Sequence, residues 1–550
     1  MSLEKNMSLS GQPPNSFSTN QKLGVVIGIF GLFILVLAAC NVNLPNKSFW
    51  LVASLISITT GIIFFAQASY RNKKQGINND GIWFKAISSR GAIAWMTGIT
   101  ITGFYIVLYF FAELLGLGQG VDNANTGLIG LFDPLSRLLS GNAASQWFVY
   151  GTLYTVAIVS FGVKFLLKYK KNKYQQLRTA SVMFFQTAFA YIIPELMARL
   201  NSESFSLPYN DLKNMWPLNY YAFEQWRVDQ FINAQHIGLF FLLLGIIIIF
   251  VVSPWLTYKY GKRWYCSWVC GCGALAETVG DSFRHLSDKG IKAWRLERWM
   301  INTVLVFSVV TTTATISTYL GYDASKYWLT KNVFLISVGS LLILVFTSVL
   351  YYKRNQLKQD AIKGAIGFFA LTLGFLVLIG FVDLNGLQIN ASYFSFGLNE
   401  NLYSFDGALR SSYGFFIGSI FSGVIGTGFY PIFGARVWCR MGCPMAAILG
   451  IQQRLFSKFR ITTNGGQCIS CGNCSTYCEQ GIDVRAYAQK GENIVRSSCV
   501  GCGVCSAVCP RGVLKLENDS LSGRINPTQV LLGNDVDLLS LMNNKEQSQQ

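Results

Sequence analysis

The chain has 550 residues, of which 51% are hydrophobic and only 13% are charged. Its mean hydropathy of +0.36 excludes an ordinary soluble enzyme and indicates a polytopic membrane protein. The formal net charge is +18, but the Lys and Arg residues lie mainly in loops between apolar runs. The positive-inside rule explains this distribution, so we expect no nucleic-acid partner.

The first 21 residues are polar and rich in Ser, Asn and Gln, which predicts a disordered cytoplasmic tail. A transmembrane domain is expected over residues 22–434, because about ten apolar runs of spanning length follow the tail. These runs lie near residues 22–40, 49–69, 91–117, 145–167, 179–197, 236–257, 299–320, 333–352, 364–384 and 413–433. No cleavable signal pattern precedes the first run.

Cations mark alternate connections between these runs. They gather near residues 71–90, 168–178, 259–298 and 353–363. This bias predicts that both termini are cytoplasmic. An outer loop is expected over residues 198–235, in which the aromatic stretch 215–221 is predicted to anchor at the membrane interface.

Two short cysteine motifs follow the sixth and tenth runs. Both read R-x-x-C-x3-C, with Arg263, Cys266 and Cys270 in the first and Arg436, Cys439 and Cys443 in the second. Positions i and i+4 share one helix face, so each motif is predicted to present two thiolates inward. The nearby Arg residues would favour the thiolate forms. Four thiolates can ligate a further iron–sulfur centre, while redox thiols or structural cysteines are the alternatives. Cys272 has no assigned role.

A linker over residues 435–465 leads to a segment, 466–516, that reads C-x2-C-x2-C-x3-C twice. In this pattern three closely spaced thiolates bind one cluster, and the fourth binds the other. It predicts an α+β module of the bacterial ferredoxin type with two 4Fe-4S clusters. The first is expected on Cys468, Cys471, Cys474 and Cys509, and the second on Cys499, Cys502, Cys505 and Cys478. The alternative is a zinc ribbon. Zinc needs only four ligands for each site and would not call for a third Cys at x2 spacing.

Two further features of this end of the chain bear on its chemistry. Glu479 stands where a Pro usually follows the fourth Cys, and residues 517–550 form a polar tail. Nearly all of the fourteen cysteines lie in short motifs beside basic segments. That arrangement favours metal ligation in a reducing cytoplasm over disulfides.

Two C-x3-C motifs after membrane spans, followed by a double 4Fe-4S module, resemble the membrane polyferredoxin family. The resemblance covers residues 263–510 and implies membrane-bound electron transfer. The cysteines that correspond to the family's C-x3-C-P motifs are Cys439, Cys443, Cys266 and Cys270. Gly271 stands where the first motif would have its Pro.

We therefore predict an iron–sulfur protein of a bacterial inner membrane that moves electrons between a cytoplasmic donor or the quinone pool and a membrane or periplasmic partner. Other redox subunits are the expected partners, and a quinone is the candidate small molecule. His236, at a membrane end, could take a quinol proton, and an ordinary interfacial histidine is the alternative. Two alternatives stay open. One is an assembly factor that reduces a metal or thiol for a respiratory enzyme, and the other is a redox-sensing regulator or transporter. The chain shows no complete substrate site, as expected for an oxidoreductase component.

Overall fold

The computed structural model describes residues 17–71, 91–201, 207, 211, 213–322, 326–354, 357, 359–381, 388–390, 402–518, 531–532 and 536–537. Most of the predicted N-terminal tail lies outside these residues. So do the predicted cytoplasmic cations of segment 72–90 and most of the C-terminal tail.

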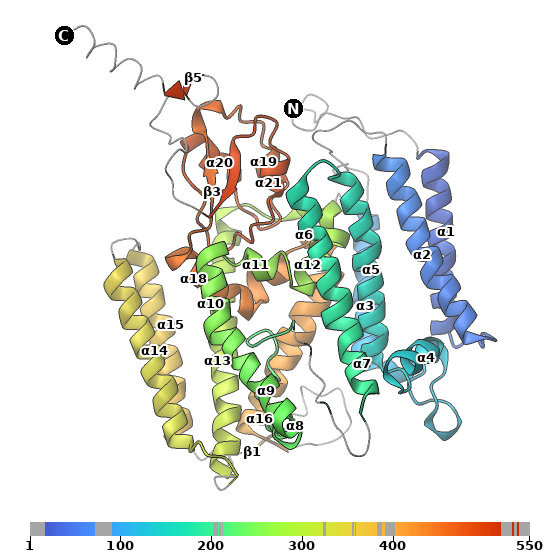
Figure 1. Ribbon diagram of the computed structural model, residues 1–550, viewed down its shortest axis with the longest axis horizontal. Coiled ribbons are helices and arrows are strands. Elements are labelled where there is room, and N and C mark those ends of the chain that lie inside the picture. Colours follow the sequence, from blue (N-terminus) through green and yellow to red (C-terminus); the bar gives the residue numbers. More distant parts are fainter. Residues whose placement is uncertain are drawn as a thin grey trace.

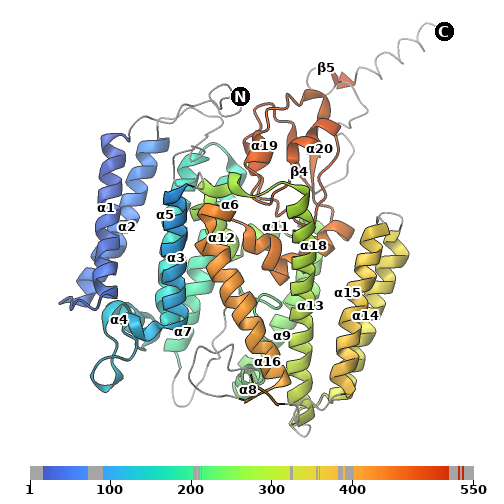
Figure 2. The same cartoon turned by 180° about the vertical axis from the view of Figure 1, so that it is seen from behind.

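Within the described part of the chain, nine helices are long and apolar enough to cross a membrane, which indicates a multi-pass membrane protein. They form the body of the molecule in Figures 1 and 2. They are α1 (Thr19–Ala39), α2 (Lys47–Tyr70), α3 (Ala92–Phe110), α5 (Gln146–Lys168), α6 to α7 (Lys173–Arg199), α9 to α10 (Gln235–Tyr260), α13 (Ile291–Tyr322), α14 (Lys331–Lys353) and α15 (Gln359–Phe381).

The tenth predicted run is helical as well, but irregular. It contains the 15-residue π-helix η10 (Gly414–Gly428), between α16 (Phe405–Tyr413) and α17 (Tyr430–Phe433). Two other long helices carry π-turns at mid-length, η6 (Phe185–Ile192) and η7 (Ile248–Val252). Such turns interrupt the regular ladder of backbone hydrogen bonds and are frequent at functional sites. The third run is shorter than predicted, because α3 ends at Phe110.

Small residues bring α1 and α2 into close contact. A Cβ atom on Gly24 would lie 2.8 Å from the carbonyl oxygen of Gly61, and one on Gly31 would lie 2.6 Å from that of Ser54. Ser54 in turn donates its hydroxyl to the carbonyl of Gly31, at 2.8 Å. Close approach of small residues and an interhelical hydrogen bond are the usual means by which apolar helices associate in lipid.

Shorter elements connect these helices at both ends of the bundle. Those at the end away from the cysteine-rich domain are η4 (Ala112–Leu115), η5 (Val121–Asn123), α4 (Gly127–Ser140), α8 (Gln225–Asn233), β1 (Gln388–Asn390) and β2 (Leu402–Ser404). Beneath the cysteine-rich domain lie α11 (Arg263–Cys266), α12 (Gly271–Thr278), η8 (Val279–Leu286), η11 (Trp438–Gly442) and α18 (Pro444–Phe456). The second set holds both C-x3-C motifs.

The cysteine-rich domain sits on one end of the bundle (Figure 1). Its antiparallel pair β3 (Arg460–Thr463) and β4 (Leu514–Glu517) brings the two ends of the domain together. Its helices are α19 (Asn473–Thr476), α20 (Val484–Lys490) and α21 (Val504–Ala507), with the short turn η12 (Gly465–Gln467) before them. A two-residue pair, β5 (Leu531–Leu532) and β6 (Val536–Asp537), follows the domain. The fold class is therefore α-helical with an α+β C-terminal domain, as predicted.

We predict that the end of the bundle bearing the cysteine-rich domain faces the cytoplasm. Lys171, in the turn between α5 and α6 at that end, and Trp328, between α13 and α14 at the other, are exposed. A Trp328→Cys variant should therefore react with an impermeant maleimide added to spheroplasts, and Lys171→Cys should react only after detergent. The parent protein gives the background labelling. The reverse pattern would contradict the predicted orientation.

Candidate metal centres

The two halves of the cysteine-rich domain fold alike. Each begins with a C-x2-C loop, after which a glycine adopts positive φ, 80° at Gly472 and 74° at Gly503. A four-residue helix follows in each half and holds the third cysteine, Cys474 in α19 and Cys505 in α21. Glycine suits these positions because a side chain is strained at positive φ. The loop thereby turns sharply enough to point its thiols to one side.

Two cavities separate the eight thiols into two sets. A first cavity is lined by Cys468, Cys471, Cys474 and Cys509. A second cavity is lined by Cys478, Cys499, Cys502 and Cys505. Each cavity thus gathers three cysteines of one motif and the fourth of the other. These are the two sets that the crossover rule assigns to two clusters.

The spacing of the thiols fits clusters better than single metal ions. In a tetrahedral zinc site with Zn–S bonds of about 2.3 Å, the sulfur atoms lie roughly 3.8 Å apart. Among the described residues, no three of the fourteen thiols lie within 4.8 Å of one another. A cluster holds its cysteine sulfurs farther apart because each binds a different iron atom. The geometry therefore argues against the zinc alternative in both cavities.

Burial governs the protonation of these thiols. It raises the pKa of Cys499 and Cys502 to about 11 and that of Cys474 to about 12. Without iron, these groups would be thiols at neutral pH. Binding a cluster requires thiolates, so loading must release protons, and the apparent affinity must rise with pH.

The loop of the second cavity is bound to the helical part of the chain through its backbone. Four consecutive carbonyls, from Cys499 to Cys502, each accept a hydrogen bond from a side chain outside the cysteine-rich domain. The donors are Gln453 Nε2 to Cys499 at 2.8 Å, Ser267 Oγ to Val500 at 2.8 Å, Tyr174 Oη to Gly501 at 2.8 Å and Gln175 Nε2 to Cys502 at 2.9 Å. The second cavity therefore faces the bundle.

The four C-x3-C cysteines come together although the two motifs are far apart in sequence. Cys266, Cys270, Cys439 and Cys443 are all buried and belong to one core group. Tyr265 and Trp438 pack in the same group, as does Val500 from the loop of the second cavity. The predicted meeting of the two motifs is thus present in the structure.

The helical geometry predicted for these motifs is wrong. Cys266 ends the short helix α11, while Cys270 has extended backbone and begins α12. Cys443 likewise has extended backbone, ahead of α18. Pro444 gives the physical reason in the second motif, because a proline disfavours helical backbone in the residue before it. Each motif is therefore a break between two helices.

The two flanking Arg residues make different contacts, although both were predicted to favour the thiolate forms of the C-x3-C cysteines. Arg436 lies beside the thiols, with Nη1 3.6 Å from Cys439 Sγ. Arg263 instead packs over the Phe459 ring, 4.8 Å from its centroid, and donates to Asn518 Oδ1 at 2.8 Å. Only Arg436 can offset charge at the C-x3-C cysteines by direct contact.

The prediction for segment 215–221 also needs correction. Met215 and Leu218 pack against the core group of the C-x3-C cysteines rather than lying at an outer interface. The neighbouring Lys213 is buried, and its ammonium donates to Gln186 Oε1 at 2.7 Å. The backbone carbonyl of Lys213 accepts the hydroxyl of Tyr265 at 2.9 Å. The loop between α7 and α8 therefore reaches into the protein, where irregular backbone is tolerated because side chains satisfy it.

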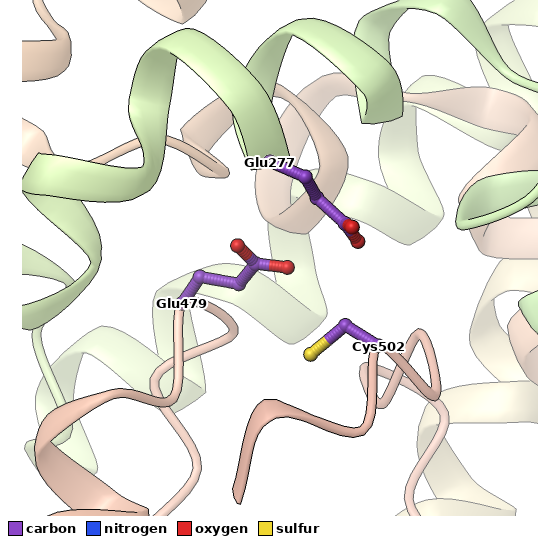
Figure 3. A group of neighbouring side chains, drawn as sticks. All are labelled: Glu277, Glu479 and Cys502. Atoms are coloured by element: carbon purple, nitrogen blue, oxygen red, sulfur yellow. The ribbon is translucent and has the colours of Figure 1, made fainter. Parts of the chain in front are cut away.

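A group of buried ion pairs, which we call the charge junction, lies between the second cavity and the C-x3-C cysteines. Its pairs are Arg178–Glu277, Arg436–Glu277, Arg436–Glu479, Arg284–Glu479, Arg284–Asp281 and Lys168–Asp281. Every side chain in it is at most 3% exposed. Figure 3 shows two of its carboxylates pointing toward the thiol of Cys502. Sequence reasoning singled out Glu479 and Arg436 but not their partners.

Comparison with known families gives these cysteines a chemical identity. Residues 460–510 match the family model of the 4Fe-4S dicluster domain. The chain therefore carries a binding domain for two 4Fe-4S clusters. Residues 242–290 and 413–462, which contain the two C-x3-C motifs, match the model of a 4Fe-4S binding domain. The two predicted clusters are thus confirmed, although their individual ligands remain a prediction.

One curated relative points to the same type of protein. It is YccM of Escherichia coli (strain K12), described as an electron transport protein, and it is 40% identical over 53 residues. The match covers 10% of this chain and 15% of YccM. No solved structure matches the chain. Together with the family models, this match confirms the resemblance to ferredoxin-like membrane electron-transfer proteins.

The contact between the second loop and the bundle predicts a difference between two glycines. Gly501 and Gly512 have the same backbone, with φ of 62° and 63°, so alanine at either position costs roughly 1–2 kcal/mol in strain. A Cβ on Gly501 would also lie 2.7 Å from Arg263 Cβ, whereas Gly512 has nothing within 4 Å. Gly501→Ala should therefore lower the temperature at which cluster absorption bleaches more than Gly512→Ala does. Equal shifts would contradict the docked arrangement.

Proposed function

We propose that this protein transfers electrons between the dicluster domain and the C-x3-C cysteines at the end of the membrane bundle. The observation that carries the proposal is the shared core group, in which Val500 and Cys502 pack with both C-x3-C motifs. Electron transfer needs short distances through well-packed protein, and this contact supplies one. We further propose that the dicluster end is cytoplasmic, as the charge bias favours, and that the membrane is a bacterial inner membrane.

The residues of the dicluster domain serve to hold and tune the two clusters. In our proposal Cys468, Cys471, Cys474 and Cys509 bind the first cluster, and Cys478, Cys499, Cys502 and Cys505 bind the second. A bound 4Fe-4S cluster supplies one-electron transfer at a potential set by burial and local charge. In the second set, Cys499 and Cys505 are buried, which limits the contact of that cavity with water. Tyr174 and Gln453 hold the loop against the bundle.

The C-x3-C cysteines are the proposed electron partner of the second cluster inside the membrane domain. A third iron–sulfur centre on Cys266, Cys270, Cys439 and Cys443 is the first possibility, in line with the match of both segments to a 4Fe-4S binding domain. One contact favours a second candidate function, thiol or metal reduction in assembly of another enzyme. Cys272 packs against the core group that contains Cys270, which places a fifth thiol beside the C-x3-C cysteines for thiol exchange.

The first cavity is the proposed entry point for electrons from a soluble donor or a partner subunit. Its lining includes the exposed Arg485 and Arg511, and it contains no acidic side chain. Ile469, also in the lining, is 58% exposed. An apolar residue flanked by two cations suits an acidic electron-carrier protein, because complementary charge speeds encounter. A quinone remains a candidate partner within the membrane domain.

Iron content tests the assignment of ligands. Anaerobically purified protein should contain about eight iron atoms from the dicluster domain. We expect Cys471→Ser to disturb the electron paramagnetic resonance signal of one cluster and Cys502→Ser that of the other, because the two thiols line different cavities. Stoichiometric zinc with little acid-labile sulfide would overturn the assignment.

The role of the C-x3-C cysteines is tested by Cys266→Ser and Cys439→Ser. Each should abolish electron delivery beyond the dicluster domain, and the double variant should be no worse, because the thiols act as one site. The dicluster signals should stay intact. If a third centre exists, the parent protein holds more than eight iron atoms and the variants fall to about eight. A variant lacking all four thiols that still reduces its partner at the normal rate would refute this part of the proposal.

A further inference from the structure

Glu479 occupies an unusual position for a carboxylate. It is fully buried, and it directly follows Cys478, a residue lining the second cavity. One carboxylate oxygen lies 2.5 Å from Arg284 Nη1, and the other lies 2.9 Å from Arg436 Nε. An oxygen of Glu479 also lies within 4.8 Å of the sulfur of Cys502 (Figure 3). A full negative charge is therefore held beside a predicted cluster ligand, out of contact with water.

Arg436 extends from this carboxylate to the other cysteine site. Its Nη1 lies 3.6 Å from Cys439 Sγ and 3.3 Å from the carbonyl oxygen of Cys266. Its Nη2 pairs with Glu277. One planar guanidinium thus touches a carboxylate beside the second cavity and a thiol of the C-x3-C motifs. Only Arg has the fork of donors that such a position requires.

The charge junction is unsuited to binding a cation, although two carboxylates and a thiol converge there. Each of those carboxylates, Glu277 and Glu479, is already paired with two guanidinium groups. The six ion pairs together join four cations to three carboxylates. A metal ion would meet a net positive environment. A 4Fe-4S cluster with its four thiolates is negatively charged, so the excess positive charge suits the neighbouring second cavity instead.

We propose that Glu479 and Arg436 are positioning residues that set the reduction potential of the second cluster and couple its charge to the C-x3-C cysteines. A negative charge disfavours the addition of an electron nearby, and a positive charge favours it. In a buried site these opposing effects are only weakly screened by salt. The coupling to the C-x3-C cysteines rests on the proposed function, while the effect on the second cluster requires only the dicluster domain.

The test is a redox titration of the full-length protein in detergent, with both clusters followed by electron paramagnetic resonance. Glu479→Gln removes a negative charge at constant size and should shift the potential of the second cluster to more positive values. Arg436→Gln removes a positive charge and should shift it to more negative values. The first cluster should keep its potential in both variants. Opposite shifts confined to one cluster cannot arise from general loosening of the fold.

Glu297→Gln is the matched control. Glu297 is a buried carboxylate paired with Arg440 at 3.1 Å, but it is absent from the group around Cys502. It should leave both potentials unchanged. Arg436→Lys keeps the positive charge, so the potential of its second cluster should stay near that of the parent protein. This variant keeps the proposal testable if Arg436→Gln fails to assemble. Shifts of the same sign in Glu479→Gln and Arg436→Gln, equal shifts of both clusters, or no shift would overturn the proposal.

The coupling has a test of its own. Cys439→Ser should shift the potential of the second cluster in the parent protein, and the shift should be smaller in the Arg436→Lys background, where the guanidinium contact is lost. An unchanged second cluster in Cys439→Ser would overturn the coupling. The proposed function fails on a different result, namely normal electron delivery without the C-x3-C thiols. The two failures are therefore distinguishable.

Discussion

A carboxylate can be ionised inside a protein only where other charges replace the water that it has lost. Glu479 meets this constraint with two guanidinium groups, Arg284 after the sixth long helix and Arg436 in the second C-x3-C motif. The dicluster domain cannot satisfy the charge of Glu479 alone, because both of its partners lie outside that domain. The two parts are therefore one folded unit, and the placement of the second cavity against the C-x3-C cysteines depends on that unit.

The two parts are also joined by hydrogen bonds that place few demands on the side chains of the dicluster domain. The loop Cys499–Cys502 is held through its carbonyl groups, which any residue possesses. The specificity therefore lies in the donors on the bundle side, such as Tyr174 and Gln453. Within the loop itself, the main requirement is a glycine at position 501, because this residue has positive φ and lies against Arg263. The cysteines of the loop remain available for their proposed role as cluster ligands.

Local sequence rules were sufficient for the long helices and for the dicluster cysteines, but the i, i+4 helix rule failed at the C-x3-C motifs, where the backbone is extended at Cys270 and Cys443. Helix length and hydropathy located the long helices, and cysteine spacing divided eight thiols into the sets that line two cavities. No such rule predicts contacts between residues that are far apart in the sequence. Nothing local to Lys213 indicates that its segment reaches the C-x3-C cysteines, and nothing near Glu277 indicates its pairing with Arg178. From the sequence, Glu479 could be noticed only because it stands where a Pro is usual. Its ion-pair partners could be identified only from the structure.

The orientation of the second cavity has a consequence for biosynthesis. Arg284 and Arg436 precede Glu479 in the chain, so their ion pairs with its carboxylate can form only after residue 479 has been synthesised. The four hydrogen bonds to the carbonyls of Cys499 to Cys502 can form only after that. Docking of the dicluster domain on the bundle is therefore a late step in the folding of the chain.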